Sequence, residues 1–102
     1  MSEMAISVED GELGTRVVVT GDLDLSAGDA LEGLVSPLIS AAHPVEIALG
    51  GVDFMDSSGL GALLALSQLA RESGVDLRLR DPSRAVVAAL DLTQTTDLFT
   101  LI

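Results

Sequence analysis

Residues 52–61 read Val-Asp-Phe-Met-Asp-Ser-Ser-Gly-Leu-Gly, an aliphatic stretch that ends in an acid, two hydroxyls and a glycine. This pattern is typical of a strand that passes directly into a helix, and it puts the hydroxyl of Ser57 at the helix N-terminus. The first backbone N–H groups of a helix have no partner within the helix, and they lie at the positive end of its dipole. The junction can therefore hold a phosphate monoester more comfortably than most surface positions.

Short aliphatic runs alternate with helical stretches along the whole chain. The expected strands are residues 5–8, 15–20, 45–49 and 75–80, and a short apolar run follows at 98–102. The first two should form a hairpin that turns around Asp10-Gly11, with Gly14 easing the re-entry. The alternation predicts an α/β sandwich with a mixed, mostly parallel sheet and helices mainly on one face. At 102 residues, we expect one domain over 1–102.

The first and third of the three expected helices are defined by caps and prolines. Ser26 can cap the first helix. Pro37 lies inside that helix, where it lacks an N–H and clashes with the carbonyl four residues earlier, so a kink or break near Val35 is predicted. Pro82 is expected to open the third helix.

The second helix should run from Ser57 to about Ser73, with Gly74 as its C-terminal cap. A rotation of about 100° per residue separates its two faces. The residues expected against the sheet are Gly59, Ala62, Leu63, Leu66, Leu69 and Ala70. Those expected on the opposite face are Ser57, Leu60, Gly61, Leu64, Gln68, Arg71 and Glu72. Two leucines on that face are either ordinary surface residues or a small apolar patch that suits a transient partner.

The charge of the chain is strongly acidic, with 16 acids against five arginines and a formal net charge of −11. Nucleic acid and anionic lipid both need a basic footprint, so neither is an expected partner. The acidity either keeps a small domain soluble or suits a partner with a basic face. The sequence shows no signal-peptide pattern and no apolar run of about 20 residues, so we expect no membrane insertion and a cytoplasmic location.

Two kinds of chemistry can be weighed at the junction. From spacing alone, Asp56-Ser57-Ser58 is most simply a helix start in which a side-chain oxygen accepts from backbone N–H groups. A second possibility is a carboxylate cluster that holds Mg²⁺ and pairs with Ser57 in a hydrolase, although its members also suit turns and a cap; these are Asp22, Asp24, Asp53 and Asp56. The absence of cysteine removes thiolate chemistry. The only histidine, His43, precedes a proline far from Ser57, which argues against a hydrolytic triad.

The segment Asp56-Ser57-Ser58-Gly59-Leu60-Gly61, between strand and helix, resembles the signature of the STAS domain. The resemblance is greatest to the bacterial anti-sigma factor antagonists and covers nearly the whole chain. Thr20-Gly21-Asp22-Leu23-Asp24 also looks like the family's Gly-Glu-Leu-Asp turn after its second strand. Two departures are Leu25-Ser26, where the family often has bulkier polar residues before a threonine, and the lack of the family's C-terminal helix after Ile102.

The resemblance implies that Ser57 is phosphorylated by an anti-sigma factor that is also a serine kinase. The unphosphorylated form would bind this kinase and free a sigma factor, phosphorylation would end the binding, and a serine phosphatase acting on phospho-Ser57 would restore it. Such a partner-switching phosphoprotein of transcription regulation is not an enzyme and needs no catalytic residue, cofactor or metal. The expected partner surface consists of Asp22, Asp24, Asp56, Ser57, Ser58, Gly59, Leu60, Gly61 and Leu64.

An alternative of a different class is a STAS-like scaffold, an accessory subunit of a transporter or of a stress-signalling complex. In that case Ser57 need not be phosphorylated. An intact Asp56-Ser57 pair favours the switch. The absence of a kinase gene in the genomic neighbourhood would favour the scaffold.

Overall fold

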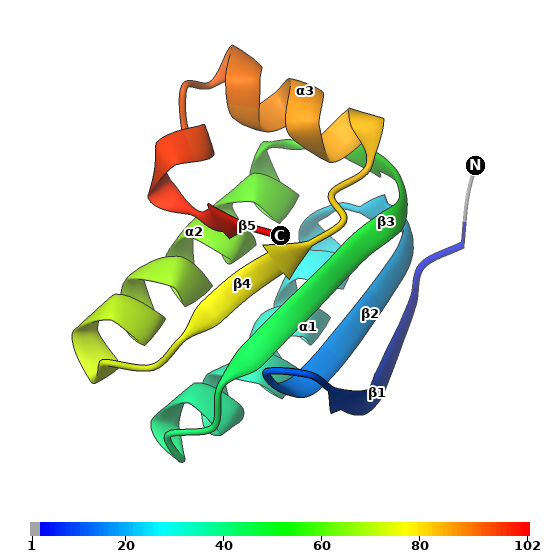
Figure 1. Cartoon of the computed structure of the whole chain (residues 1–102). Coiled ribbons are helices and arrows are strands. Elements are labelled where there is room, and N and C mark those ends of the chain that lie inside the picture. The colour runs from blue at the N-terminus through cyan, green and yellow to red at the C-terminus, as the bar shows by residue number, and fades with distance from the viewer. Residues whose placement is uncertain (1–2) are drawn as a thin grey trace.

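The computed structural model describes residues 3–102 and contains a five-stranded sheet in the order β1-β2-β3-β4-β5 (Figure 1). The strands are β1 Ala5–Gly11, β2 Gly14–Leu23, β3 Val45–Met55, β4 Leu77–Arg80 and β5 Thr100–Leu101. β1 pairs antiparallel with β2, and the remaining neighbours pair in parallel. The expected mixed, mostly parallel sheet is confirmed.

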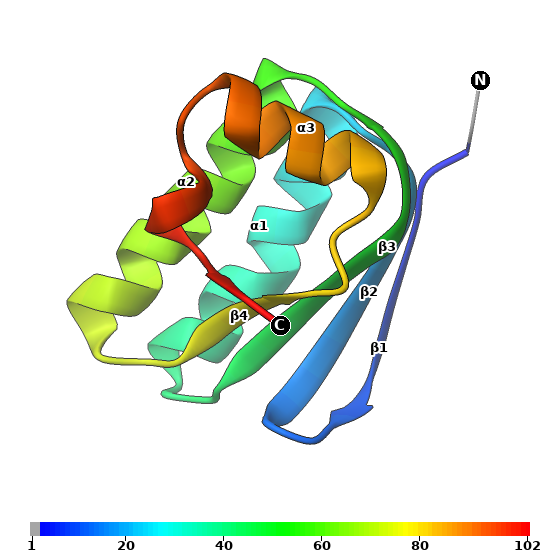
Figure 2. The same cartoon turned by 45° about the horizontal axis from the view of Figure 1, so that its top comes forward.

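The helices are α1 Leu25–Ser40, α2 Ser57–Ser73 and α3 Arg84–Leu92, followed by the short 3-10 helix η1 Thr96–Leu98. α1 and α2 lie side by side against one face of the sheet, and α3 crosses above the far end of β3 (Figures 1 and 2). β4 pairs with β3 only as far as Ala48. The chain then turns into α3, where the Ser83 N–H donates to the Leu49 carbonyl at 3.2 Å. α3 therefore covers the part of β3 that β4 leaves unpaired.

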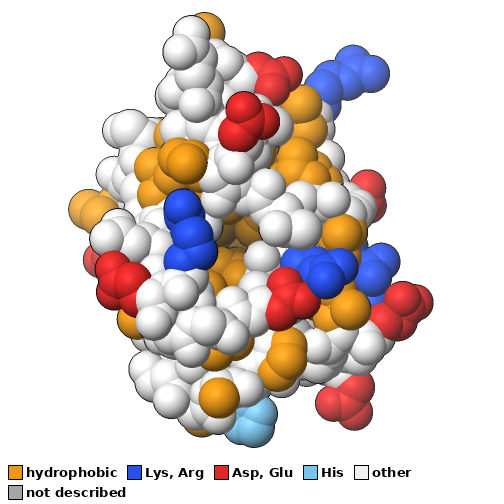
Figure 3. Space-filling model, turned by 60° about the vertical axis from the view of Figure 1, so that its left-hand side comes forward, with side chains coloured by type: hydrophobic (Ala, Val, Ile, Leu, Met, Phe, Trp, Pro, Cys, Tyr) orange, Lys and Arg blue, Asp and Glu red, His pale blue; other side chains and the backbone are white. Residues whose placement is uncertain are grey.

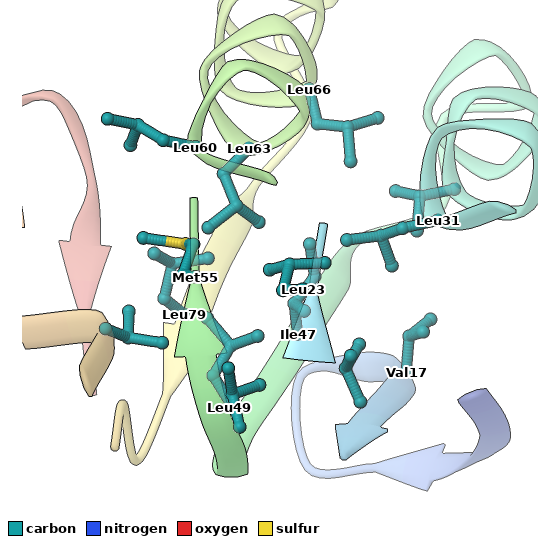
Figure 4. Close-up of a cluster of buried hydrophobic side chains, with 14 of the residues drawn as sticks. Val17, Leu23, Leu31, Ile47, Leu49, Met55, Leu60, Leu63, Leu66 and Leu79 are labelled. Carbon is teal, nitrogen blue, oxygen red and sulfur yellow. The ribbon is translucent and has the colours of Figure 1, made fainter. Parts of the chain in front are cut away.

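The core between helices and sheet is almost entirely aliphatic. Ile47 and Leu49 of β3 and Leu79 of β4 face Leu63 and other leucines of the helices (Figure 4). Each such side chain contributes about 1.5–3 kcal/mol by leaving water. No helix among residues 3–102 is both long enough and apolar enough to cross a membrane.

The hairpin and the first helix differ in detail from the sequence expectations. The hairpin turns at Glu12-Leu13, not at Asp10-Gly11, because the strands pair as far as Gly11 and Gly14. Asp24, not Ser26, caps α1, since its Oδ1 accepts from the Ala27 N–H at 3.0 Å. The aspartate lies directly after β2 and so leaves no room for a turn before the helix.

The two prolines also act differently from expectation. α1 continues through Pro37 to Ser40, so the predicted break is wrong. Pro37 is exposed near the last turn, and the carbonyl that its missing N–H would have bonded belongs to the exposed Gly33, where water can replace the bond. Pro82 precedes α3, whose cap is Ser83, with its Oγ accepting from the Val86 N–H at 3.3 Å.

The second helix has the predicted ends. α2 spans Ser57–Ser73, and Gly74 is a left-handed cap with φ of 66°. The Val75 N–H donates to the Ala70 carbonyl at 2.9 Å. This bond belongs to the end of the helix, so β4 begins at Leu77, two residues later than expected.

The sheet face that carries no helix holds a buried carboxylate. Glu46 on β3 is 0% exposed, and its Oε1 accepts from the Nε atoms of Arg16 and Arg80 on the neighbouring strands. Burial opposes ionisation of Glu46, but the two guanidinium hydrogen bonds outweigh it and hold the pKa of this carboxyl below its usual value. The triad therefore ties β2, β3 and β4 together by side chains as well as by backbone.

Candidate functional site

The β3–α2 junction places Ser57 on the surface. β3 ends at Met55, and Asp56 caps α2 by accepting the Gly59 N–H at its Oδ1, at 3.0 Å. Ser57 is the first residue of the helix and is exposed, whereas Ser58 is only partly exposed. Within residues 3–102, the N–H groups of these two serines have no hydrogen-bond partner. The hydroxyl of Ser57 thus stands free beside two available donors, and the cap itself is Asp56.

The junction between β2 and α1 lies next to the β3–α2 junction and is built in the same way. Leu23, the last residue of β2, pairs with Met55, and the Asp56 N–H reaches the Leu23 carbonyl at 3.4 Å. Asp24 then caps α1 as Asp56 caps α2. Thr20 to Leu23 lie within β2, with an irregularity in the pairing at Gly21/Asp22, so this segment is not the turn after the strand that was expected. The two strand-to-helix junctions therefore form one edge of the molecule.

Close packing at this edge explains Gly59. A Cβ on Gly59 would lie 2.0 Å from the Leu23 carbonyl oxygen, so only glycine lets α2 start against the end of β2. Gly59 is buried, as expected for the sheet-facing side of α2, and it has no side chain to offer a partner. Gly61 is exposed, and a Cβ there would meet nothing within 4 Å.

The carboxylates are spread along the edge. Asp22 is paired with Phe54 in the sheet, and Asp53 is exposed on β3. No three His, Cys, Asp or Glu side chains of residues 3–102 gather where they could hold a metal ion. His43 precedes β3, at the opposite end of that strand from Ser57. The hydroxyl of Ser57 therefore lies next to the carboxylate of Asp56, and the other carboxylates stand apart along the same edge.

The outer face of α2 is only partly open. Leu60 is 8% exposed and belongs to the hydrophobic core, so its predicted exposure is wrong; on its outer side it lines a cleft that Ala89 and Leu92 of α3 also line. Leu64 is half-buried and lines a groove of about 540 Å³ together with Gln68, Arg71, Glu72 and Leu98. Figure 3 shows the side of the molecule on which α2 lies, where hydrophobic side chains are visible among the charged ones and at the floor of a hollow. Ser67 of α2 donates to the Leu98 carbonyl at 2.9 Å and so links α2 to η1.

Comparison with known proteins agrees with this architecture. The family model described as "Mlab, STAS domain" matches residues 7–100. This chain belongs to the STAS domain family.

Relatives of this STAS domain include regulators of sigma factors. The anti-sigma-B factor antagonist of Bacillus subtilis (strain 168) is 26% identical over 93 residues, which are 91% of this chain and 85% of that protein. An anti-sigma factor antagonist from Mycobacterium paratuberculosis superposes with a TM-score of 0.83 at 25% identity, covering 97% of this chain and 85% of the other. The antagonist SpoIIAA in its unphosphorylated form gives a TM-score of 0.77 at 20% identity, covering 96% and 88%. SpoIIAA is also known in a phosphorylated form, with a TM-score of 0.71.

A cleft beside Ser57 was not foreseen from the sequence of this STAS domain. It has a volume of about 180 Å³ and lies between the start of α2 and the end of α3. Leu92, the last residue of α3, forms one wall and is 86% exposed. The available signal was that Leu92 falls away from the inward face of α3, which carries the buried Val86 and Leu90.

Proposed function

We propose that this STAS domain is an anti-sigma factor antagonist, a substrate and ligand rather than an enzyme. Its unphosphorylated form binds an anti-sigma factor that is also a serine kinase, and this binding frees a sigma factor. Phosphorylation of Ser57 switches the binding off, and a serine phosphatase restores it. The observation that carries the proposal is the exposed hydroxyl of Ser57 at the start of α2, directly after the capping Asp56.

The location explains why the fold can accept a phosphate. Phosphorylation adds about −1.5 to −2 charges and three acceptor oxygens. At Ser57 these oxygens meet the positive end of the α2 dipole and the free N–H groups of Ser57 and Ser58. The domain therefore keeps its structure in both states, and the change is confined to its surface.

The same phosphate is unfavourable to a bound partner. It would stand beside the carboxylates of Asp56 and of the neighbouring β2–α1 junction, on a surface that a partner must desolvate. A penalty of about 3 kcal/mol in the complex corresponds to roughly a hundredfold loss of affinity. Two residues of the expected partner surface, Gly59 and Leu60, are buried. The others remain proposed contacts and are Asp22, Asp24, Asp56, Ser57, Ser58, Gly61 and Leu64.

A kinase assay tests this function. The ATP-binding anti-sigma factor encoded nearest to this chain's gene is incubated with the chain and ATP, and the products are mapped by mass spectrometry. We expect one phosphate, on Ser57, in the wild type and in the matched control Ser58→Ala. Ser57→Ala should remain unphosphorylated and keep binding the kinase.

Two results would sink the proposal. Phosphate found on Ser58 would show that Ser58, and not Ser57, is the phosphoacceptor. An anti-sigma factor that neither binds nor phosphorylates the folded chain would favour the scaffold function, in which the domain is an accessory subunit of a transporter or stress-signalling complex.

A further inference from the structure

The cleft beside Ser57 has an apolar interior that is open to solvent. Met55, Leu60, Ala89 and Leu92 provide its apolar walls, and Asp56 and Ser57 complete its lining. A dry cavity of about 150 Å³ holds a benzene-sized group. The volume of about 180 Å³ therefore suits one leucine, methionine or phenylalanine side chain.

Leu92 has no structural need for its position. The inward face of α3 is formed by Val86 and Leu90, both 0% exposed, whereas Leu92 is 86% exposed. A large apolar side chain held this far into water contributes nothing to the core. Next to an apolar cleft, however, it can add contact area to whatever enters.

The charges around the cleft are negative. Asp56 lies in its lining, and the C-terminal end of α3 presents the negative end of a helix dipole. Asp22 and Asp53 lie within the last three residues of β2 and β3, at the same edge.

The arginines lie elsewhere. In the strand register, Arg16 and Arg78 lie opposite Glu46, near the other end of β3, and Arg80 lies opposite Ala48. Arg71 is in the last turn of α2, and Arg84 begins α3 while Leu92 ends it. The cleft therefore matches an apolar side chain that is flanked by basic residues.

We propose that this cleft takes one apolar side chain of the anti-sigma factor kinase, flanked by a lysine or arginine, with Leu92 as the determinant of that contact. The proposal rests on the proposed function, because the kinase must reach Ser57 on the cleft rim. It also adds a cause to the switch: a phosphate on Ser57 would place a charged, hydrated group at the mouth of an apolar site, where the incoming side chain has to shed its water.

Substitution of Leu92 tests the contact. Binding of the same kinase to the wild type, Leu92→Ala and Leu92→Glu is measured by calorimetry. Truncation of an apolar interface anchor should weaken binding about tenfold, and the glutamate about a hundredfold, because a charge is then driven into the cleft. Val87→Ala is the matched control, on the same helix and 37% exposed but outside the cleft, and should bind within about twofold of the wild type.

The outcomes separate this proposal from the proposed function. If the wild type binds the kinase and loses affinity on phosphorylation of Ser57, but both Leu92 variants bind like wild type, the cleft proposal is overturned and the function stands. If the wild type does not bind the kinase at all, both fail. A change in self-association of Leu92→Glu in sedimentation, with kinase binding unchanged, would assign the cleft to a second copy and overturn the proposal. Thermal melts of all variants should agree, since Leu92 is exposed.

Discussion

Gly59 and Gly61 lie in the first turns of α2, two residues apart, and the same substitution should affect them in opposite directions. An alanine Cβ at position 59 would lie 2.0 Å from the Leu23 carbonyl oxygen and 2.9 Å from the carbonyl carbon. These are backbone atoms of a buried strand end, so no side-chain rotation relieves the clash. At position 61 the Cβ meets nothing within 4 Å.

The magnitudes follow from this difference. Overpacking costs about 1–3 kcal/mol or more, and the gain in helix propensity from glycine to alanine is at most about 1 kcal/mol. We therefore expect Gly59→Ala to lower the free energy of unfolding by about 2 kcal/mol, and Gly61→Ala to raise it by about 0.5–1 kcal/mol. For a domain of this size these values correspond to melting temperatures about 10 °C lower and about 2–6 °C higher.

Urea and thermal denaturation of the two variants provide the assay. Gly59→Ala should also reduce the rate of Ser57 phosphorylation, because α2 must shift to relieve the clash. Gly61→Ala leaves α2 in place, so it can lower this rate only through the contact of its added methyl group with the kinase. Equal stability of both variants and the wild type would refute the close contact between α2 and the end of β2.

Substitutions at Leu60, Asp56 and Glu46 test other parts of the structure. Leu60→Ala should cost about 2–4 kcal/mol of unfolding free energy, against at most about 0.5 kcal/mol for Leu92→Ala, in urea titrations; the reverse order would show that Leu60 is not part of the core. Asp56→Ala should lose about 1 kcal/mol of helix capping while Asp56→Ser retains most of it, and equal losses for the two would argue against the cap. Glu46→Gln should cost about 1–3 kcal/mol at about pH 7. The pKa of Glu46 is lowered in the fold, so its stabilisation exists above its usual value of 4.5 and disappears as the pH falls through the folded pKa. The difference between wild type and Glu46→Gln should therefore shrink as the pH falls below 4.5, and a constant difference would contradict the ion pairs.

Local signals were enough to predict the site's backbone. α2 begins after Asp56 and ends at Gly74 because a cap and a left-handed glycine act within one helical turn, and the sequence shows both. Asp24 and Ser26 are both good caps, and the choice between them depended on where β2 ends, which its pairing with β3 sets.

The features that were not predicted depend on contacts between residues that are far apart in the sequence. Leu60 has the helical phase of an exposed residue, but its side chain is buried in the core cluster, beside the end of α3 that packs over β3. Glu46 interrupts an apolar strand, and its burial depends on arginines that β2 and β4 bring to it across the sheet. The cleft likewise exists only where the ends of α3 and β3 meet the start of α2.

Calorimetric titration of the anti-sigma factor kinase with unphosphorylated protein, phospho-Ser57 protein and Ser57→Asp tests the switch most directly. We expect tight binding of the first, about a hundredfold weaker binding of the second, and an intermediate affinity for the aspartate, which carries less charge and volume than phosphate. All three should melt at similar temperatures, because the N-terminus of α2 accepts negative charge. Equal affinities for the three forms would contradict the assignment of Ser57 as a binding switch.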